Sequence, residues 1–300
     1  MECFEKKMIN LGIIGYTDGN GHPYSYSSIF NGYNKKGMKI CPFKTIPAYL
    51  SKHNSDLERI KHAKITHIWT QDNEISKKIA FASNILNIVD NPSQMIGMVD
   101  GVIIARDDYE SHLQLARPFI DAGVNVFIDK PIAIKAKAAE DILKLEQFSG
   151  QIFSSSSLAY DPRVLEAREN LSNLGDIKYI YASAPGVWEN YAIHLIDGLM
   201  AILGNDIEIE NRIYDRDDMI TVLNGKLNNK IPTKIACMGG LVSPLRITIV
   251  GSKGFFDIDF SDPYHCFKNT LEVFVLSITQ KKSMRSHRDI IKSIKLTELP

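Results

Sequence analysis

Lys130 stands out among the charged residues of this sequence because of what surrounds it. It follows the apolar run Val124–Ile128 and precedes Pro131, and the similar run Gly101–Ala105 lies one helix-length earlier. Both runs are short and β-branched, which is typical of buried parallel strands, and segment 108–123 has the apolar spacing of a crossover helix. The pattern predicts a βαβ unit with one amine at the carboxyl end of a strand, the edge where open α/β sheets bind ligands.

A second candidate is His194, which lies on the predicted helix Trp188–Leu203. At about 100° per residue, Asn190, His194 and Asp197 fall within about 60° of one another, and most other positions of the helix are apolar. Buried polar groups need partners. The partner of these three polar side chains is either another side chain or a bound substrate, and both possibilities stay open.

A glycine-containing turn follows the first predicted strand, Ile9–Gly15, and a helix starts near Pro23. Strand, glycine turn and helix in this order are typical of a phosphate cradle. The glycines, Gly15, Gly19 and Gly21, either contact a cofactor or only make a sharp turn.

The elements needed to position these residues form two groups. Up to residue 133, strands alternate with helices, which predicts a Rossmann-type parallel sheet. Beyond it, short strands dominate from residue 207 onward, which favours an antiparallel sheet. The fold class is therefore α/β, with a parallel-sheet domain over 1–133 and an α+β domain with a mostly antiparallel open sheet over 134–300. The later elements are expected at helices 135–148, 162–174 and 188–203 and at strands 151–155, 177–184, 219–223, 234–238, 246–250 and 255–260.

Composition excludes several classes of protein. The 300 residues carry 35 acidic and 35 basic side chains, without the dense basic patch that binding to nucleic acid requires. The four cysteines have no metal-ligand spacing, so we expect a reducing, cytoplasmic environment and no metal. No apolar run approaches 18 residues and the first residues show no signal pattern, so no membrane association is expected.

Four motifs in order resemble the Gfo/Idh/MocA family of NAD(P)-dependent oxidoreductases, which act mainly on sugars, cyclitols and related polyols. The most specific is AGVNVFIDKPIA around Lys130, which looks like that family's AGKHVxxEKPLA. His112 in the preceding helix, HLIDGLMAILG from His194 and IVGSKGFFDIDF from Ile249 support it. The resemblance implies a dinucleotide-binding domain over 1–133 and a domain for substrate binding and oligomerisation over 134–300.

Roles for Lys130 and His194 also come from this resemblance. The family's lysine lies between nicotinamide and substrate, and a histidine four residues after an aspartate acts as acid or base; here Asn190 takes the place of that aspartate. Oxidising a secondary alcohol releases a hydride and a proton, and histidine suits the transfer of the proton. Lysine can stabilise the developing alkoxide or carbonyl oxygen.

The expected cofactor site departs from the family pattern. A dinucleotide fingerprint would place glycines at 15, 17 and 20, whereas Gly15, Thr17 and Asn20 stand there. Where the family often has an acid for the ribose hydroxyls, this chain has Thr70, followed by Gln71 and Asp72. Arg106 either contacts a phosphate or pairs with Asp107 or Asp108. The residues expected to bind the cofactor are Gly15, Thr17, Gly19, Asn20, Gly21, Thr70, Gln71, Asp72, Arg106 and Lys130.

A substrate-binding set is expected on segments of the second domain. Aromatic residues at helical spacing are more often core than ligand contacts. The candidates are Tyr160, Arg163, Trp188, Asn190, Tyr191 and Asp197.

The favoured function is an oxidoreductase that uses NAD or NADP and transfers a hydride to or from a sugar, cyclitol or nucleotide-sugar. A small-molecule partner and a homodimer or homotetramer are expected by resemblance. The alternative is a non-redox regulatory module that binds a nucleotide or sugar on the same scaffold. The broken fingerprint and Asn190 motivate that alternative.

Overall fold

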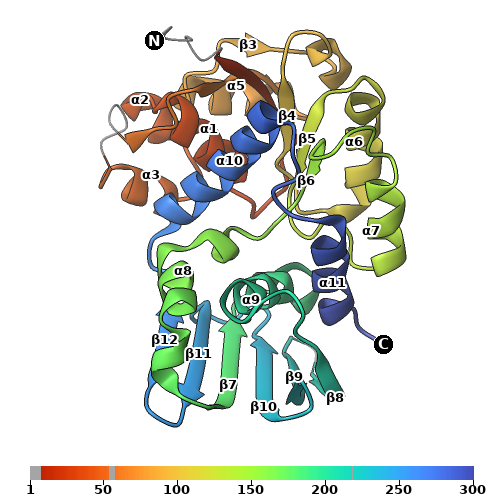
Figure 1. Cartoon of the computed structure of the whole chain (residues 1–300). Helices are drawn as coiled ribbons and strands as arrows, with labels where there is room; N and C mark the ends of the chain where they lie inside the picture. Colours follow the sequence, from red (N-terminus) through yellow and green to blue (C-terminus); the bar gives the residue numbers. More distant parts are fainter. Residues whose placement is uncertain (1–7, 54–57, 218) are drawn as a thin grey trace, which may run out of the picture. The chain divides into compact units, whose positions relative to one another are not determined.

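The computed structural model describes residues 8–53, 58–217 and 219–300, which divide into two compact units (Figure 1). The first unit comprises 1–132, 141–154 and 270–285, and the second comprises 133–140, 155–269 and 286–300. The predicted boundary at residue 133 thus lies at the first passage between units. The chain then returns twice to the first unit, each time within a helix, and no feature of the sequence indicated these returns.

The first unit is built on a six-stranded parallel sheet with strand order β3-β2-β1-β4-β5-β6. Three central strands consist almost entirely of buried β-branched and other apolar residues, as a sheet covered on both faces requires. This arrangement confirms the Rossmann-type sheet. Its strands are β1 (Ile9–Ile14), β2 (Ala63–Trp69), β3 (Asn87–Ile88), β4 (Gly101–Ile104), β5 (Asn125–Ile128) and β6 (Ile152–Phe153).

Helices complete this unit. The sequence favours α6 strongly, because its buried positions Ala116, Phe119 and Ile120 share one face. The carboxyl-terminal part of α10 also belongs here: Phe274 packs on Phe127 of β5 and Phe153 of β6, with ring centroids 5.6 and 6.2 Å apart. The helices are α1 (His22–Asn31), α2 (Lys35–Met38), α3 (Thr45–Leu50), α5 (Asn73–Ala82), η1 (Pro92–Met95), η2 (Tyr109–Ser111) and α6 (His112–Asp121).

The second unit contains a six-stranded sheet with order β12-β11-β7-β10-β9-β8, in which only the pair β7–β10 is parallel. Helix α9 packs on this sheet and contributes a row of buried apolar side chains to its core (Figure 1). The mostly antiparallel sheet is therefore confirmed. Its strands are β7 (Ile177–Ala184), β8 (Ile209–Arg216), β9 (Thr221–Leu227), β10 (Ile231–Cys237), β11 (Arg246–Gly251) and β12 (Phe255–Asp259).

Several expected elements differ in extent. The helix predicted over 135–148 is only α7 (Ala136–Leu143), and the one predicted over 162–174 is α8 (Pro162–Glu169) followed by the short η4 (Leu171–Leu174). Strand β8 and helices α10 (Pro263–Gln280) and α11 (His287–Thr297) were not expected. Helix α9 (Trp188–Leu203) and η3 (Ser157–Tyr160) complete the set. In the part of the chain that the structure describes, no helix combines the length and hydropathy of a membrane span.

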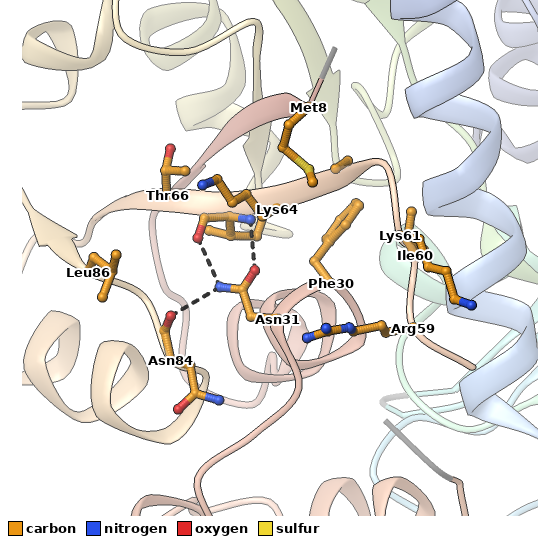
Figure 2. A pocket seen from close by; sticks show the side chains of 12 residues that line it. Met8, Phe30, Asn31, Arg59, Ile60, Lys61, Lys64, Thr66, Asn84 and Leu86 are labelled. Atoms are coloured by element: carbon orange, nitrogen blue, oxygen red, sulfur yellow. Dashed lines mark hydrogen bonds between the residues drawn. The ribbon is translucent and has the colours of Figure 1, made fainter. Parts of the chain in front are cut away.

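Asn31, the last residue of α1, is the polar centre of a pocket of about 470 Å³ beside the first half of β2 (Figure 2). Its amide donates to the carbonyls of Ile65 and Ser83, at 2.8 and 3.1 Å, and accepts from the Ile65 backbone N–H at 3.0 Å. It therefore occupies the hydrogen-bonding positions that a neighbouring strand would take beside Ile65, where β3 does not reach.

Replacing Asn31 with alanine is expected to lower the free energy of unfolding by about 2 kcal/mol, because backbone groups of β2 lose their partners. Asn31→Asp is expected to cost more, since a carboxylate would face carbonyl oxygens. Urea unfolding measures both. Lys64→Ala, at an exposed position of the same pocket, is the matched control and should change stability little. Equal stabilities of the three variants would contradict the assignment.

Candidate functional site

The glycine turn of the first unit is fixed by groups at the ends of β2 and β4, the two strands that flank β1. Gly15 has φ +87° and donates its N–H to Trp69 at 2.7 Å. The Gln71 side-chain amide bonds to both the N–H and the carbonyl of Tyr16. Thr17 donates its hydroxyl to Asp107 at 2.7 Å. The turn is therefore held to the residues that follow β2 and β4.

The same turn presents backbone donors that have no acceptor. Within the described ranges, no group accepts from the N–H of Thr17, Asp18, Gly19 or Gly21. Helix α1 begins directly afterwards, with Pro23 in its first turn. Consecutive unpaired N–H groups at a helix start are the elements of a phosphate-binding site, so these residues fit the pyrophosphate of a dinucleotide even without the usual glycine spacing.

Asp129 connects this turn to Lys130. The carboxylate is 1% exposed, and its Oδ2 accepts from the Asn20 amide at 3.2 Å and from Nδ1 of His22 at 2.6 Å. Its Oδ1 accepts from the backbone N–H of Lys130 at 2.9 Å. Burial alone would raise the pKa of the Asp129 carboxyl, but the charge and hydrogen bond of His22, together with Lys130, hold that pKa well below its ordinary value. Asp129 is thus an anion joining the two turns.

Lys130 itself follows β5 and is 6% exposed, whereas exposed lysines are the rule in proteins. The position matches the prediction of one amine at the carboxyl end of a buried strand. His112, from the first turn of α6, has Nε2 2.8 Å from the Arg106 carbonyl and Nδ1 3.1 Å from the Ile132 carbonyl. It therefore links the turns that follow β4 and β5.

Thr70 and Asp72, which follow β2, are engaged in local structure. The Thr70 hydroxyl donates to the Asp72 carbonyl and lies 2.8 Å from that of Ser76, and Thr70 is 4% exposed. Asp72 caps α5 by accepting from the Glu74 N–H at 2.8 Å and remains exposed. Of these two residues, Asp72 is the one that presents a side chain to solvent.

Arg106 makes the salt bridge that was one of its two expected roles. Its Nε and Nη2 donate to the two carboxylate oxygens of Asp108 at 2.6 and 2.5 Å. The guanidinium lowers the pKa of the Asp108 carboxyl against the opposing effect of burial. The Arg106 side chain also occupies the space that a Cβ at Gly15 would need, so glycine there permits a close approach.

In the second unit, His194 and Asp197 on α9 both bind Ser156. Nδ1 of His194 lies 2.7 Å from the Ser156 hydroxyl. Asp197 is 2% exposed, and its two oxygens accept from the Ser156 N–H at 2.7 Å and the Ser293 hydroxyl at 2.6 Å. Both carboxylate oxygens of Asp197 thus have protein partners, which is one of the two possibilities left open by the sequence. Asn190 is half-buried one turn before His194.

Two of the other expected substrate contacts, Trp188 and Arg163, have partners elsewhere in the second unit. The Trp188 ring is buried in the core and donates Nε1–H to the Thr297 carbonyl at 2.7 Å. The Arg163 guanidinium is bonded to Asp259 and to the Asp257 carbonyl of β12. Tyr191 packs 5.5 Å from the His194 ring, centroid to centroid, and the Tyr160 carbonyl accepts from Asn269. Of these four, Tyr191 has a ring contact with His194.

Comparison with known proteins places the central part of the first unit in a family. Residues 47–157 match the model of an oxidoreductase family with an NAD-binding Rossmann fold. This segment belongs to the Gfo/Idh/MocA family. The match includes the turns after β2, β4 and β5. It confirms the family resemblance of the motif around Lys130. It also supports the expected class of cofactor, NAD or NADP.

Solved Gfo/Idh/MocA-like structures share the fold over nearly the whole chain. Scyllo-inositol dehydrogenase from Lactobacillus casei with bound NAD(H) and scyllo-inositol is 17% identical, with 97% of this chain and 95% of that chain covered and a TM-score of 0.71. Myo-inositol 2-dehydrogenase from Lactobacillus plantarum is 14% identical over 97% and 95%, with a TM-score of 0.75. A variant of KijD10, a 3-ketoreductase from Actinomadura kijaniata in complex with TDP-benzene and NADP, is 11% identical over 97% and 96%, with a TM-score of 0.73. No curated protein sequence matches significantly.

Three residues of the site were not among those expected to act in catalysis or to bind cofactor or substrate. Asp129, His22 and Ser156 each bind an expected residue. Asp129 lies beside Lys130 in the most specific motif, so the sequence could have indicated that this acid belongs to the site. His22 lies 107 residues from Asp129, and Ser156 lies 38 from His194, so neither contact has a local signature.

Asp197→Ala is expected to lower the free energy of unfolding by about 2–4 kcal/mol, because it leaves two buried donors without an acceptor. Asp197→Asn, which keeps one acceptor, should cost less. Asp206→Ala, at an exposed carboxylate of the same unit, is the control and should change stability by less than about 0.5 kcal/mol. Urea unfolding gives these values. Unchanged stability of Asp197→Ala with loss of polyol turnover would instead assign Asp197 to substrate binding.

Proposed function

We propose that this protein is an NAD(P)-dependent oxidoreductase that interconverts a secondary alcohol and a ketone on a sugar, cyclitol or nucleotide-sugar. The observation that carries the proposal is the connection through Asp129 between a turn with unpaired N–H donors and the turn that holds Lys130. The family match to an NAD-binding Rossmann fold supports the cofactor. The compounds bound to two structural neighbours, scyllo-inositol and TDP-benzene, support the substrate class.

In this proposal the backbone N–H groups of residues 17, 18, 19 and 21 would bind the pyrophosphate, and a bound nicotinamide would supply or accept the hydride. Lys130 donates a hydrogen bond to the substrate oxygen and stabilises negative charge as it develops there. His194 exchanges the hydroxyl proton through Nε2, because Nδ1 is engaged by Ser156. Asn190 replaces a carboxylate one turn away, so Ser156 is the group that orients the imidazole.

Direct titration tests the proposal. Purified protein is mixed with NADH or NADPH and nucleotide fluorescence is followed, after which inositols, hexoses and nucleotide-sugars are screened for absorbance change at the nicotinamide band. We expect binding of at least one nucleotide and turnover of a polyol that falls by at least about 100-fold in His194→Ala. Failure of both nucleotides to bind would refute the function.

A second candidate, the non-redox module, is favoured by the broken glycine fingerprint, with Thr17 and Asn20 in place of glycines, and by Asn190. It predicts tight nucleotide binding without turnover of any polyol or ketone in the same screen. Size-exclusion chromatography with light scattering in those preparations tests the proposed homodimer or homotetramer.

A further inference from the structure

The turn after β2 carries negative charge where a dinucleotide's adenosine ribose would be held. In Rossmann folds the residues just after the second strand contact the ribose hydroxyls, one of which carries the extra phosphate in NADP. Here that turn is Thr70-Gln71-Asp72-Asn73-Glu74, with two acids and no base. Asp72 and Glu74 are both exposed, and Gln71 joins the turn to the glycine turn through Tyr16.

We infer that this chain selects NAD over NADP, with Asp72 as the residue that determines the choice. The inference rests on the proposed function. A 2′-phosphate would bring about −1.5 to −2 charges toward the Asp72 and Glu74 carboxylates, whereas a free ribose hydroxyl can donate a hydrogen bond to a carboxylate. Oxygen Oδ1 of Asp72 already accepts from the Glu74 N–H, so the second oxygen is the one that faces the ribose.

Thr70 does not compensate for this charge. In the sequence, a threonine at the expected acidic position removes one obstacle to a 2′-phosphate. In the structure, the Thr70 hydroxyl and N–H are both used locally, by Asp72 and Ser76, and the residue is buried. Thr70 therefore has no group left to bind a phosphate, and the next side chains along the turn decide the specificity.

Two neighbouring basic groups, Lys77 and Arg106, are engaged by acids. Lys77 of α5 pairs with Glu74 at 2.7 Å. Arg106, from the turn after β4, is held in a two-pronged salt bridge by Asp108. Binding a 2′-phosphate through either side chain would require breaking an existing ion pair, which adds to the cost of NADP.

Equilibrium titration of the full-length protein with NADH and NADPH tests the inference. We expect the dissociation constant for NADPH to exceed that for NADH by about tenfold or more. Asp72→Ser removes the charge but keeps a side chain that can cap α5, and it should reduce this ratio at least about threefold, mainly by tightening NADPH. Adding Glu74→Gln should reduce the ratio further.

Asp121→Ser is the matched control, because it also removes one exposed acid. Asp121 is the last residue of α6, and it lies close to the amino end of β5, away from the carboxyl ends of the strands where the nucleotide is expected. In this variant the ratio of the NADPH dissociation constant to the NADH dissociation constant should equal that of the unmodified protein. Thermal unfolding verifies that each variant is folded. Equal or tighter binding of NADPH by the unmodified protein, or an unchanged ratio in folded Asp72→Ser, overturns the inference while leaving the proposed function standing. Failure of both nucleotides to bind overturns the two together.

Discussion

Replacing Lys130 with alanine will reduce kcat by about 10²–10⁴-fold while the dissociation constant for the nicotinamide nucleotide changes by no more than a few-fold. The reason is that the proposed pyrophosphate donors are the backbone N–H groups of residues 17, 18, 19 and 21, whereas the proposed role of Lys130 is to stabilise charge that develops on the substrate oxygen. Steady-state kinetics and fluorescence titration on the same preparation separate the two quantities.

Lys130→Arg and Lys64→Ala complete this experiment. Arginine keeps the charge but not the shape of the ammonium group, so partial activity is expected at most. Lys64 is exposed near the start of β2, at the other edge of the sheet, and its loss should leave kcat unchanged. Near-normal turnover in folded Lys130→Ala would remove the lysine from the mechanism.

Asp129→Ala is expected to lower the free energy of unfolding by about 3–5 kcal/mol at pH 7. Removing one partner of a buried charged cluster leaves His22, Asn20 and the Lys130 N–H without their acceptor. Because the folded-state pKa of the Asp129 carboxyl lies below its ordinary value of about 3.9, its contribution to stability is fully present above pH 4. The contribution is lost progressively as pH falls below that value toward the folded-state pKa.

Urea unfolding of the unmodified protein and of Asp129→Asn between about pH 7 and pH 3 checks the sign. Above pH 4 the difference in unfolding free energy should be constant, and it should shrink at lower pH because the carboxyl binds a proton in the unfolded state while it stays ionised in the folded state. Asp121→Asn, on an exposed carboxylate, should track the unmodified protein throughout. A difference that grows as pH falls would mean that Asp129 is neutral in the folded protein.

Local patterns predicted most of the regular elements but not all of them. Strand β7 and helix α9 have the predicted limits, because a β-branched alternation and a helix-length apolar pattern each point to one structure. Helix α10 was missed because Val273, Phe274 and Val275 form a run typical of a strand, and packing of Phe274 against β5 and β6 favours the helix. Helix α11 did have a local signal, since Ser286 caps it by accepting from Asp289.

Local sequence patterns likewise predicted one part of the candidate site and missed another. The place of Lys130 at the end of a buried strand follows from hydrophobic pattern alone. The bond between Asn20 and Asp129 joins residues 109 positions apart, and no local pattern encodes it. Likewise, the inward orientation of Thr70 depends on Ser76 one helical turn into α5, so the identity of the residue at the strand end gave no guide to its role.

The interleaving of the two units has a consequence for how the nucleotide-type unit can be made. Phe274, which packs against Phe127 and Phe153, is supplied by the segment 270–285, near the end of the chain. During synthesis the parallel sheet therefore lacks this covering segment until residues 270–285 have left the ribosome. A fragment that stops at residue 133 would expose the apolar face that this helix covers. A protein designed to contain the first unit alone would therefore have to connect three separate segments, 1–132, 141–154 and 270–285.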